Sequence, residues 1–268
     1  MAKHIHINFD NVLEIVQKGV RRASIFMGFG VNAALDGNFK SYQLSHITHI
    51  QLVPENVAEE TLRHFKEEFQ IWIEAAGLRE LTETFAIYLD AVHEICTVMD
   101  SVRTKKVLDG IEQKKALFNR KSFREKLGFL AEKFNVRPNH PDFLISLTRA
   151  RNCLTHRLGV VGVKDLNGGN ELLVRWSGID YFAVTPTGER HDLNAIPEGG
   201  IPLPNGANVM VEFVERSRAF KIGTKVALST RELAEICWYF NLEAQKIVET
   251  ARAFAKSLGI PERNSGEG

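Results

Sequence analysis

The stretch LRELTETFAIYLDAVHEICTVMDSVR, residues 78–103, carries an apolar side chain at every third or fourth position. A period of 3.6 residues predicts a long amphipathic helix that buries one face. Its apolar positions are Leu78, Leu81, Phe85, Tyr88, Leu89, Val92, Ile95, Met99 and Val102. The same period before it, from Val57 to Ile73, predicts another helix that opens at Pro54, and Gly77 predicts a break between the two. The chain is therefore expected to build a helical bundle.

Helical spacing continues on both sides of this stretch. The apolar residues from Asn8 to Met27 recur at three and four, and Gly28 and Gly30 are predicted to end that helix. A shorter helix is predicted over Lys121 to Phe134. Another is predicted to start near Pro141 and to run to Leu158.

After Leu158 the helical spacing of apolar residues ends, and the pattern that follows predicts a small antiparallel sheet. Six short β-rich segments are separated by clusters of Gly, Asn and Pro, one of them Ser177-Gly178. They are Val160–Val163, Glu171–Trp176, Ile179–Thr185, Val209–Val214, Ala219–Ile222 and Lys225–Leu228. Ser229 and Glu232 have the spacing of a capping box, which predicts a closing helix with one apolar face.

The predicted fold class is therefore mainly α (α+β), a helical bundle with a small antiparallel β insertion before the last helix. The expected division is a bundle over 1–158, a β-rich insertion over 159–229, a closing helix over 230–260 and a flexible tail over 261–268.

Composition limits the classes of function. The 268 residues are 44% hydrophobic, which is enough for a full core, and the formal net charge of +1 gives no bulk attraction to nucleic acid. Any RNA site must therefore be a local basic patch, and two basic groups exist. The first, in a segment predicted to be a solvated connector, is Lys105, Lys106, Lys114, Lys115, Arg120, Lys121 and Arg124. The second is Arg149, Arg151 and Arg157.

The chain is expected to be cytoplasmic, because its first residues lack an apolar signal region and no run approaches the roughly 18 apolar residues of a membrane span. Three scattered cysteines, Cys96, Cys153 and Cys237, are expected to be buried thiols rather than disulfides or metal ligands.

Common cofactor and metal motifs do not fit. GFGVNA, at Gly28 to Ala33, resembles a dinucleotide loop, but a helical pattern precedes it and a glycine helix stop explains it better. The sequence contains no phosphate-binding G-x-x-x-x-G-K, zinc H-E-x-x-H or serine hydrolase elbow. The pairs His4 and His6, and His46 and His49, have no convincing third ligand. No metal or cofactor is expected.

RNCLTHRLGVV, from Arg151 to Val161, holds the strongest functional signal. At about 100° per residue, the helix from Pro141 has a core stripe of Phe143, Leu147, Ala150, Leu154 and Leu158. The opposite stripe is Ile145, Arg149, Asn152 and His156, so that a guanidinium, an amide and an imidazole project together. Arg151 lies about 140° from His156 and would need its length, or a loosened last turn, to reach the same point.

The order R-N-x-x-x-H near the end of a bundle helix resembles the signature of the HEPN (higher eukaryotes and prokaryotes nucleotide-binding) superfamily. The resemblance implies an all-α bundle and, for many members, a metal-independent endoribonuclease of a toxin or phage defence system. It also implies a homodimer in which two motifs face one cleft. Arg151, Asn152 and His156 are then the catalytic candidates, and Arg149 and Arg157 the substrate-binding candidates.

In such a site the RNA supplies its own 2′-hydroxyl nucleophile, and the protein supplies proton transfer and positive charge. His156 is expected to act as base or acid, Arg151 to hold the phosphate, and Asn152 to orient His156 or to donate to a phosphate oxygen. Arg149 is a second candidate for the charge. Because one histidine cannot easily be both acid and base in one step, two copies are favoured, with 2′,3′-cyclic phosphate and 5′-hydroxyl products.

Three alternatives stay open. The chain could be a HEPN-like module that binds a nucleotide, RNA or a protein without turnover, or a toxin controlled by a neighbouring antitoxin or nucleotidyltransferase. The motif could also be a polar cluster in which Arg and His cap helix carbonyls ahead of Gly159.

Overall fold

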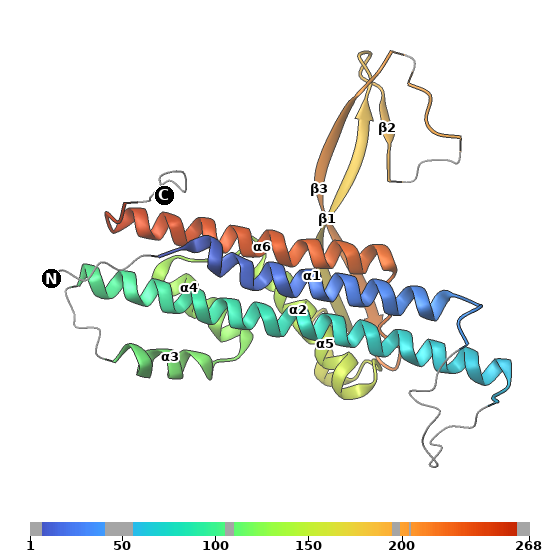
Figure 1. Cartoon of the computed structure of the whole chain (residues 1–268), viewed down its shortest axis with the longest axis horizontal. Helices are drawn as coiled ribbons and strands as arrows, with labels where there is room; N and C mark the ends of the chain where they lie inside the picture. Colours follow the sequence, from blue (N-terminus) through green and yellow to red (C-terminus); the bar gives the residue numbers. More distant parts are fainter. Residues whose placement is uncertain (1–6, 41–55, 105–109, 195–198, 204, 262–268) are drawn as a thin grey trace.

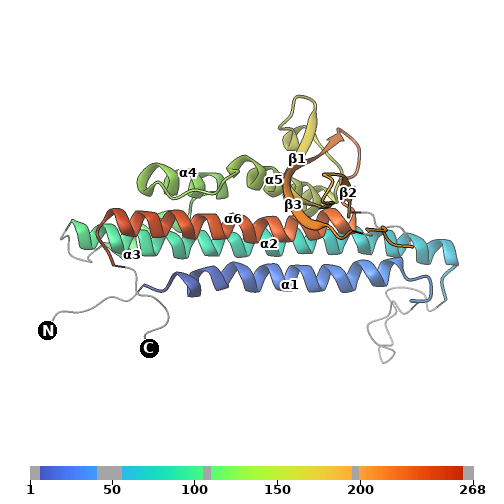
Figure 2. The same ribbon diagram turned by 90° about the horizontal axis from the view of Figure 1, so that it is seen from above.

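The computed structural model describes residues 7–40, 56–104, 110–194, 199–203 and 205–261. Its three longest helices, α1 (Phe9–Leu35), α2 (Glu59–Arg103) and α6 (Thr230–Ser257), lie side by side (Figures 1 and 2). The shorter helices are α3 (Ile111–Asn119), α4 (Phe123–Phe134) and α5 (Pro141–Arg157). Figure 2 shows α1 on one side of the α2–α6 pair and α4 and α5 on the other.

The core lies along α2 and α6, where the predicted apolar stripe of α2 is buried. Phe85 packs edge-on against Phe240 with ring centroids 5.5 Å apart, and both side chains are fully buried. The hydroxyl of Tyr88 donates to the carbonyl of Ala244 at 2.7 Å, which satisfies a polar group inside this apolar layer.

Two predicted helix ends are wrong, because Gly30 and Gly77 serve close packing between helices. α1 continues past Gly28 and Gly30 to Leu35, and α2 passes through Gly77 without a break. A Cβ on Gly30 would lie 2.4 Å from Cγ1 of Ile73, and one on Gly77 would lie 2.1 Å from Sδ of Met27. These glycines therefore let α1 and α2 approach each other closely. The predicted helix start at Pro54 lies outside the described residues. Within the described residues α2 begins at Glu59.

The segment predicted to be a solvated connector includes α3, because Phe118 is buried and stacks on His93 of α2. Lys105 and Lys106 of the same group lie outside the described residues. α4 and α5 occupy their predicted places.

In the described part of the chain the strands form a three-stranded antiparallel sheet in the order β2-β1-β3. β1 (Glu171–Val184) pairs with β3 (Asn208–Lys221) along its whole length, and β2 (Arg190–Asp192) pairs with the far end of β1. The base of this ribbon packs between α5 and α6, and its outer half projects from the bundle (Figure 1).

The six predicted strand segments are corrected in two ways. Ser177-Gly178 is no break, because a Cβ on Gly178 would lie 2.7 Å from Nε of Arg216 and the glycine admits that side chain beside an unbroken β1. Likewise β3 joins two predicted segments. Val160 pairs with Lys225 only as an isolated bridge, and the 3-10 turn η1 (Val163–Asp165) follows it, so neither outer segment extends into a strand.

α6 begins with the predicted capping box: Oγ of Ser229 accepts from the Glu232 amide, and the Glu232 carboxylate accepts from the Ser229 amide. It then packs against α1 and α2, as expected of a closing helix. The fold class, mainly α with a small antiparallel sheet before the last helix, is confirmed. None of the described helices combines the length and apolar character that a membrane crossing requires. The predicted flexible tail falls almost wholly outside the described residues.

Candidate active site

The predicted polar stripe of α5 forms the floor of a pocket of about 420 Å³. Its walls come from the start of α4 and from η1. The residues around it are Ser122, Phe123, Arg124, Ile145, Thr148, Arg149, Asn152, His156, Arg157, Lys164 and Asp165. The stripe of Ile145, Arg149, Asn152 and His156 that the sequence predicts therefore opens into one cavity.

His156 lies in the last turn of α5, where the helix is stopped by its backbone conformation. Leu158 and Gly159 both have positive φ, 51° and 80°, which ends the helix at Arg157. The His156 side chain is exposed, and it has no hydrogen bond or ion pair to any described residue. Both ring nitrogens are therefore available to a ligand in the pocket.

Arg151 is the one predicted catalytic residue that does not line this pocket. Its Nε donates to Oγ1 of Thr82 at 3.2 Å, and its Nη2 lies 3.7 Å from the Glu83 carboxylate, so the side chain lies along α2. Its Nη1 donates to Oδ1 of Asn152 at 3.0 Å. Because a guanidinium only donates hydrogen bonds, this contact identifies the amide oxygen of Asn152 and leaves Nδ2 to donate to a ligand.

The two predicted substrate-binding arginines differ in whether a carboxylate already pairs with them. Arg149 lines the pocket and uses Nη1 to donate to the carbonyl of Leu166 at 3.2 Å. Arg157 pairs through both Nε and Nη2 with the buried carboxylate of Asp165. This bond raises the pKa of Arg157 above its ordinary value, so the guanidinium stays charged but is largely neutralised by its partner.

The structure adds cations that the motif does not include. Arg124, from the first basic group of the sequence, and Lys164 of η1 line the pocket, and neither has a polar contact to another residue of the described chain. Among the described residues of the lining Asp165 is the one carboxylate, and Arg157 already binds it. The pocket therefore carries unbalanced positive charge from Arg124, Arg149 and Lys164.

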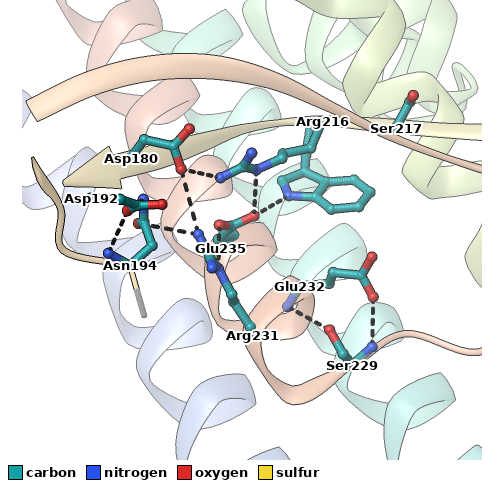
Figure 3. Close-up of a pocket in the computed structure, with 10 residues that line it drawn as sticks. Asp180, Asp192, Asn194, Arg216, Ser217, Ser229, Arg231, Glu232 and Glu235 are labelled. Carbon is teal, nitrogen blue, oxygen red and sulfur yellow. Dashed lines mark hydrogen bonds and ion pairs between the residues drawn. The ribbon is translucent and has the colours of Figure 1, made fainter. Parts of the chain in front are cut away.

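A second polar pocket, of about 460 Å³, lies between the base of the ribbon and the start of α6 (Figure 3). Its charged groups contact one another: Arg216 and Arg231 both pair with Asp180 and Glu235, and Nε1 of Trp176 donates to Glu235 at 2.9 Å. This network of two arginines and two carboxylates holds the ribbon on α6, and its own charges match. The two other carboxylates of the lining, Asp192 and Glu232, accept from the amides of Asn194 and Ser229.

The cysteines are free and buried, as predicted. Burial raises the pKa of Cys153 to about 11 and those of Cys96 and Cys237 to about 12, so all three are neutral thiols at physiological pH. Within the described ranges no group of three or more His, Cys, Asp or Glu side chains could hold a metal ion. His4, His6, His46 and His49 lie outside those ranges.

Comparison of the chain with protein-family models, with curated proteins and with solved structures found no match.

Proposed function

We propose that this chain is a HEPN-type endoribonuclease that cleaves RNA without a metal ion, at the pocket on α5. The observation that carries the proposal is the combination, in one cavity, of an oriented amide, unbalanced cations and a histidine that has no polar contact to any described residue. Cleavage of RNA by its own 2′-hydroxyl needs proton transfer and stabilisation of a negative phosphorane, and these three groups supply them.

In the proposed reaction His156 takes the proton from the 2′-hydroxyl. The 2′-oxygen then bonds to phosphorus, and the bond from phosphorus to the 5′-oxygen breaks. The leaving 5′-oxygen takes a proton from a general acid, for which the proposal uses His156 of a second copy in a homodimer with the two motifs facing each other. Nδ2 of Asn152 and the guanidinium of Arg149 donate to the phosphate oxygens as charge develops.

The test is incubation of a mixed RNA pool with the purified protein in EDTA, beside two histidine variants. His156→Ala is expected to lower the rate by about 10²- to 10⁴-fold, the usual contribution of an acid–base group. His64→Ala is the matched control, because His64 is also exposed on a helix and, among the described residues, pairs only with Glu67 and Glu68 of its own helix. Equal activity of the wild type and His156→Ala would refute the proposed role of His156.

A second function, RNA or nucleotide binding without turnover, is favoured by the position of Arg151, whose guanidinium is occupied on α2. A protein of this kind would bind RNA in a salt-dependent manner and cleave none of it, and His156→Ala would bind with unchanged affinity.

A further inference from the structure

The pocket on α5 has two walls that lie on different sides of the helix. α4 begins on the α2 side, where the ring of Phe123 lies 5.8 Å from that of Phe85. Arg151 leaves α5 on this same side to reach Thr82. η1 and Leu166 lie on the other side, where they bind Arg157 and Arg149.

One free cation stands on each wall. Arg124 is the second residue of α4, and Lys164 is the middle residue of η1. Both side chains are exposed, both line the pocket, and neither contacts an acidic partner among the described residues. Arg157 on the same rim differs from these two cations, because the buried carboxylate of Asp165 already neutralises its charge.

Asn152 and His156 lie on the floor between these walls. On a helical wheel Asn152 falls between Arg151 on the α2 side and Arg149 on the η1 side. The floor from Ile145 to His156 extends about 16 Å along the axis of α5, at 1.5 Å per residue. A ligand that spans both walls therefore passes over the reactive side chains, and the cation on each wall favours a ligand with negative charge at more than one point.

We infer that Arg124 and Lys164 bind two phosphates of one RNA strand, which flank the phosphate beside Asn152 and His156. The inference rests on the proposed function and specifies its ligand: an oligoribonucleotide laid across α5 from the α4 wall to the η1 wall, rather than a free nucleotide. The two cations are binding residues, so their loss weakens attachment of the strand more than it slows the chemical step.

The experiment measures binding of a fluorescein-labelled 2′-O-methyl oligoribonucleotide over a series of KCl concentrations. This probe lacks the nucleophile and cannot be cleaved by the proposed reaction. Each phosphate contact on a single strand contributes about 0.7 to the slope of log affinity against log salt. Arg124→Ala and Lys164→Ala are each expected to reduce the slope by about 0.7, and the double variant by about 1.4.

Arg21→Ala is the matched control, because Arg21 is an exposed arginine of α1 outside the pocket, and its slope should equal that of the wild type. Wild-type slopes in both pocket variants would overturn the inference, as would a nucleoside monophosphate that competes as well as the strand. If the wild type cleaves RNA but the slopes of both pocket variants are unchanged, the roles of Arg124 and Lys164 are refuted and the proposed reaction is not. Reduced slopes without cleavage by the wild type would remove only the proposed reaction.

Discussion

At the scale of single residues, Arg151 acts in this account through Asn152. Its guanidinium joins Thr82 on α2 to the amide oxygen of Asn152, which holds Nδ2 ready to donate to a ligand. In the proposed reaction it is thus a positioning residue. The contact with the reacting phosphate that the family resemblance assigns to it is supplied in our proposal by Arg149 and by Nδ2 of Asn152.

Replacement of Arg151 by alanine should therefore lower kcat by about 100-fold with little change in KM, since a small misplacement of a reacting group costs about that much. In an Asn152→Ala background the same replacement should have almost no further effect, because the two residues act as one unit. Arg79→Ala, which removes another arginine beside Glu83, is the control. Full additivity of the Arg151 and Asn152 effects, measured in a double-mutant cycle, would contradict the positioning role.

His93 gives a prediction for stability. Its ring is buried and stacks on Phe118 with centroids 3.9 Å apart, and its Nδ1 has no hydrogen-bond partner among the described residues. Burial, and next the charge of Lys133, lower the pKa of His93 from 6.5 to about 4. The folded state therefore holds the neutral ring, while the unfolded chain takes up a proton below about pH 6.5.

This contribution to stability is present above pH 6.5 and is lost as the pH falls toward 4. The free energy of unfolding in urea should fall over that range by up to about 3 kcal/mol more for the wild type than for His93→Phe. Parallel curves for the two proteins would show that His93 does not titrate on unfolding.

The sequence was a good guide to which side chains of α5 share a face, because a helix sets that face by its own geometry. Arg149, Asn152 and His156 indeed line one cavity. Arg124 and Lys164 could not be assigned to it, since their positions depend on how α4 and η1 pack around α5. The basic group that contains Arg124 marked it in the sequence as a candidate for RNA binding. No sequence pattern marked Lys164, which lies in a single 3-10 turn.

At the scale of elements, periodicity identified the long helices, α4 and α5 but not α3, and glycines led to wrong ends for α1 and to a false break in α2. Gly30, Gly77 and Gly178 are all adjacent to side chains from other elements, and a single sequence does not distinguish such a contact from a turn. Because glycines of α1 and α2 contact side chains of the other helix, one added methyl group at such a position should destabilise the α1–α2 interface.

Gly19 and Gly28 test this sensitivity within one helix. A Cβ on Gly19 would lie 2.6 Å from Cβ of Thr84, which cannot move without α2, whereas no atom of the described residues lies within 4 Å of one on Gly28. Gly19→Ala should lower the free energy of unfolding by about 1–3 kcal/mol, the usual cost of overpacking. Gly28→Ala should raise it by about 0.5–1 kcal/mol through helix propensity. Equal effects in chemical denaturation would contradict close packing at Gly19.

At the scale of the whole molecule, two basic groups that are separate in the sequence meet at one pocket: Arg124 from the first and Arg149 from the second. The net charge of +1 conceals this local excess. A composite site formed by two copies would add a second His156 to the same cleft.

Such a composite site should lose activity in a characteristic way when wild-type chains are mixed with inactive ones. If wild-type and His156→Ala chains are co-refolded in varying ratios, the proportion of fully wild-type dimers falls as the square of the wild-type fraction. Activity should follow this square, since acid and base come from different copies. A linear decrease would mean that each chain cleaves RNA alone.

The most direct measurement of the central claim is the chemistry of the RNA ends left by the wild-type protein in EDTA. The proposed reaction leaves fragments with 2′,3′-cyclic phosphate and 5′-hydroxyl ends, formed by attack of the 2′-hydroxyl. Fragments with 3′-hydroxyl and 5′-phosphate ends, or cleavage that appears only after a divalent metal is added, would contradict it.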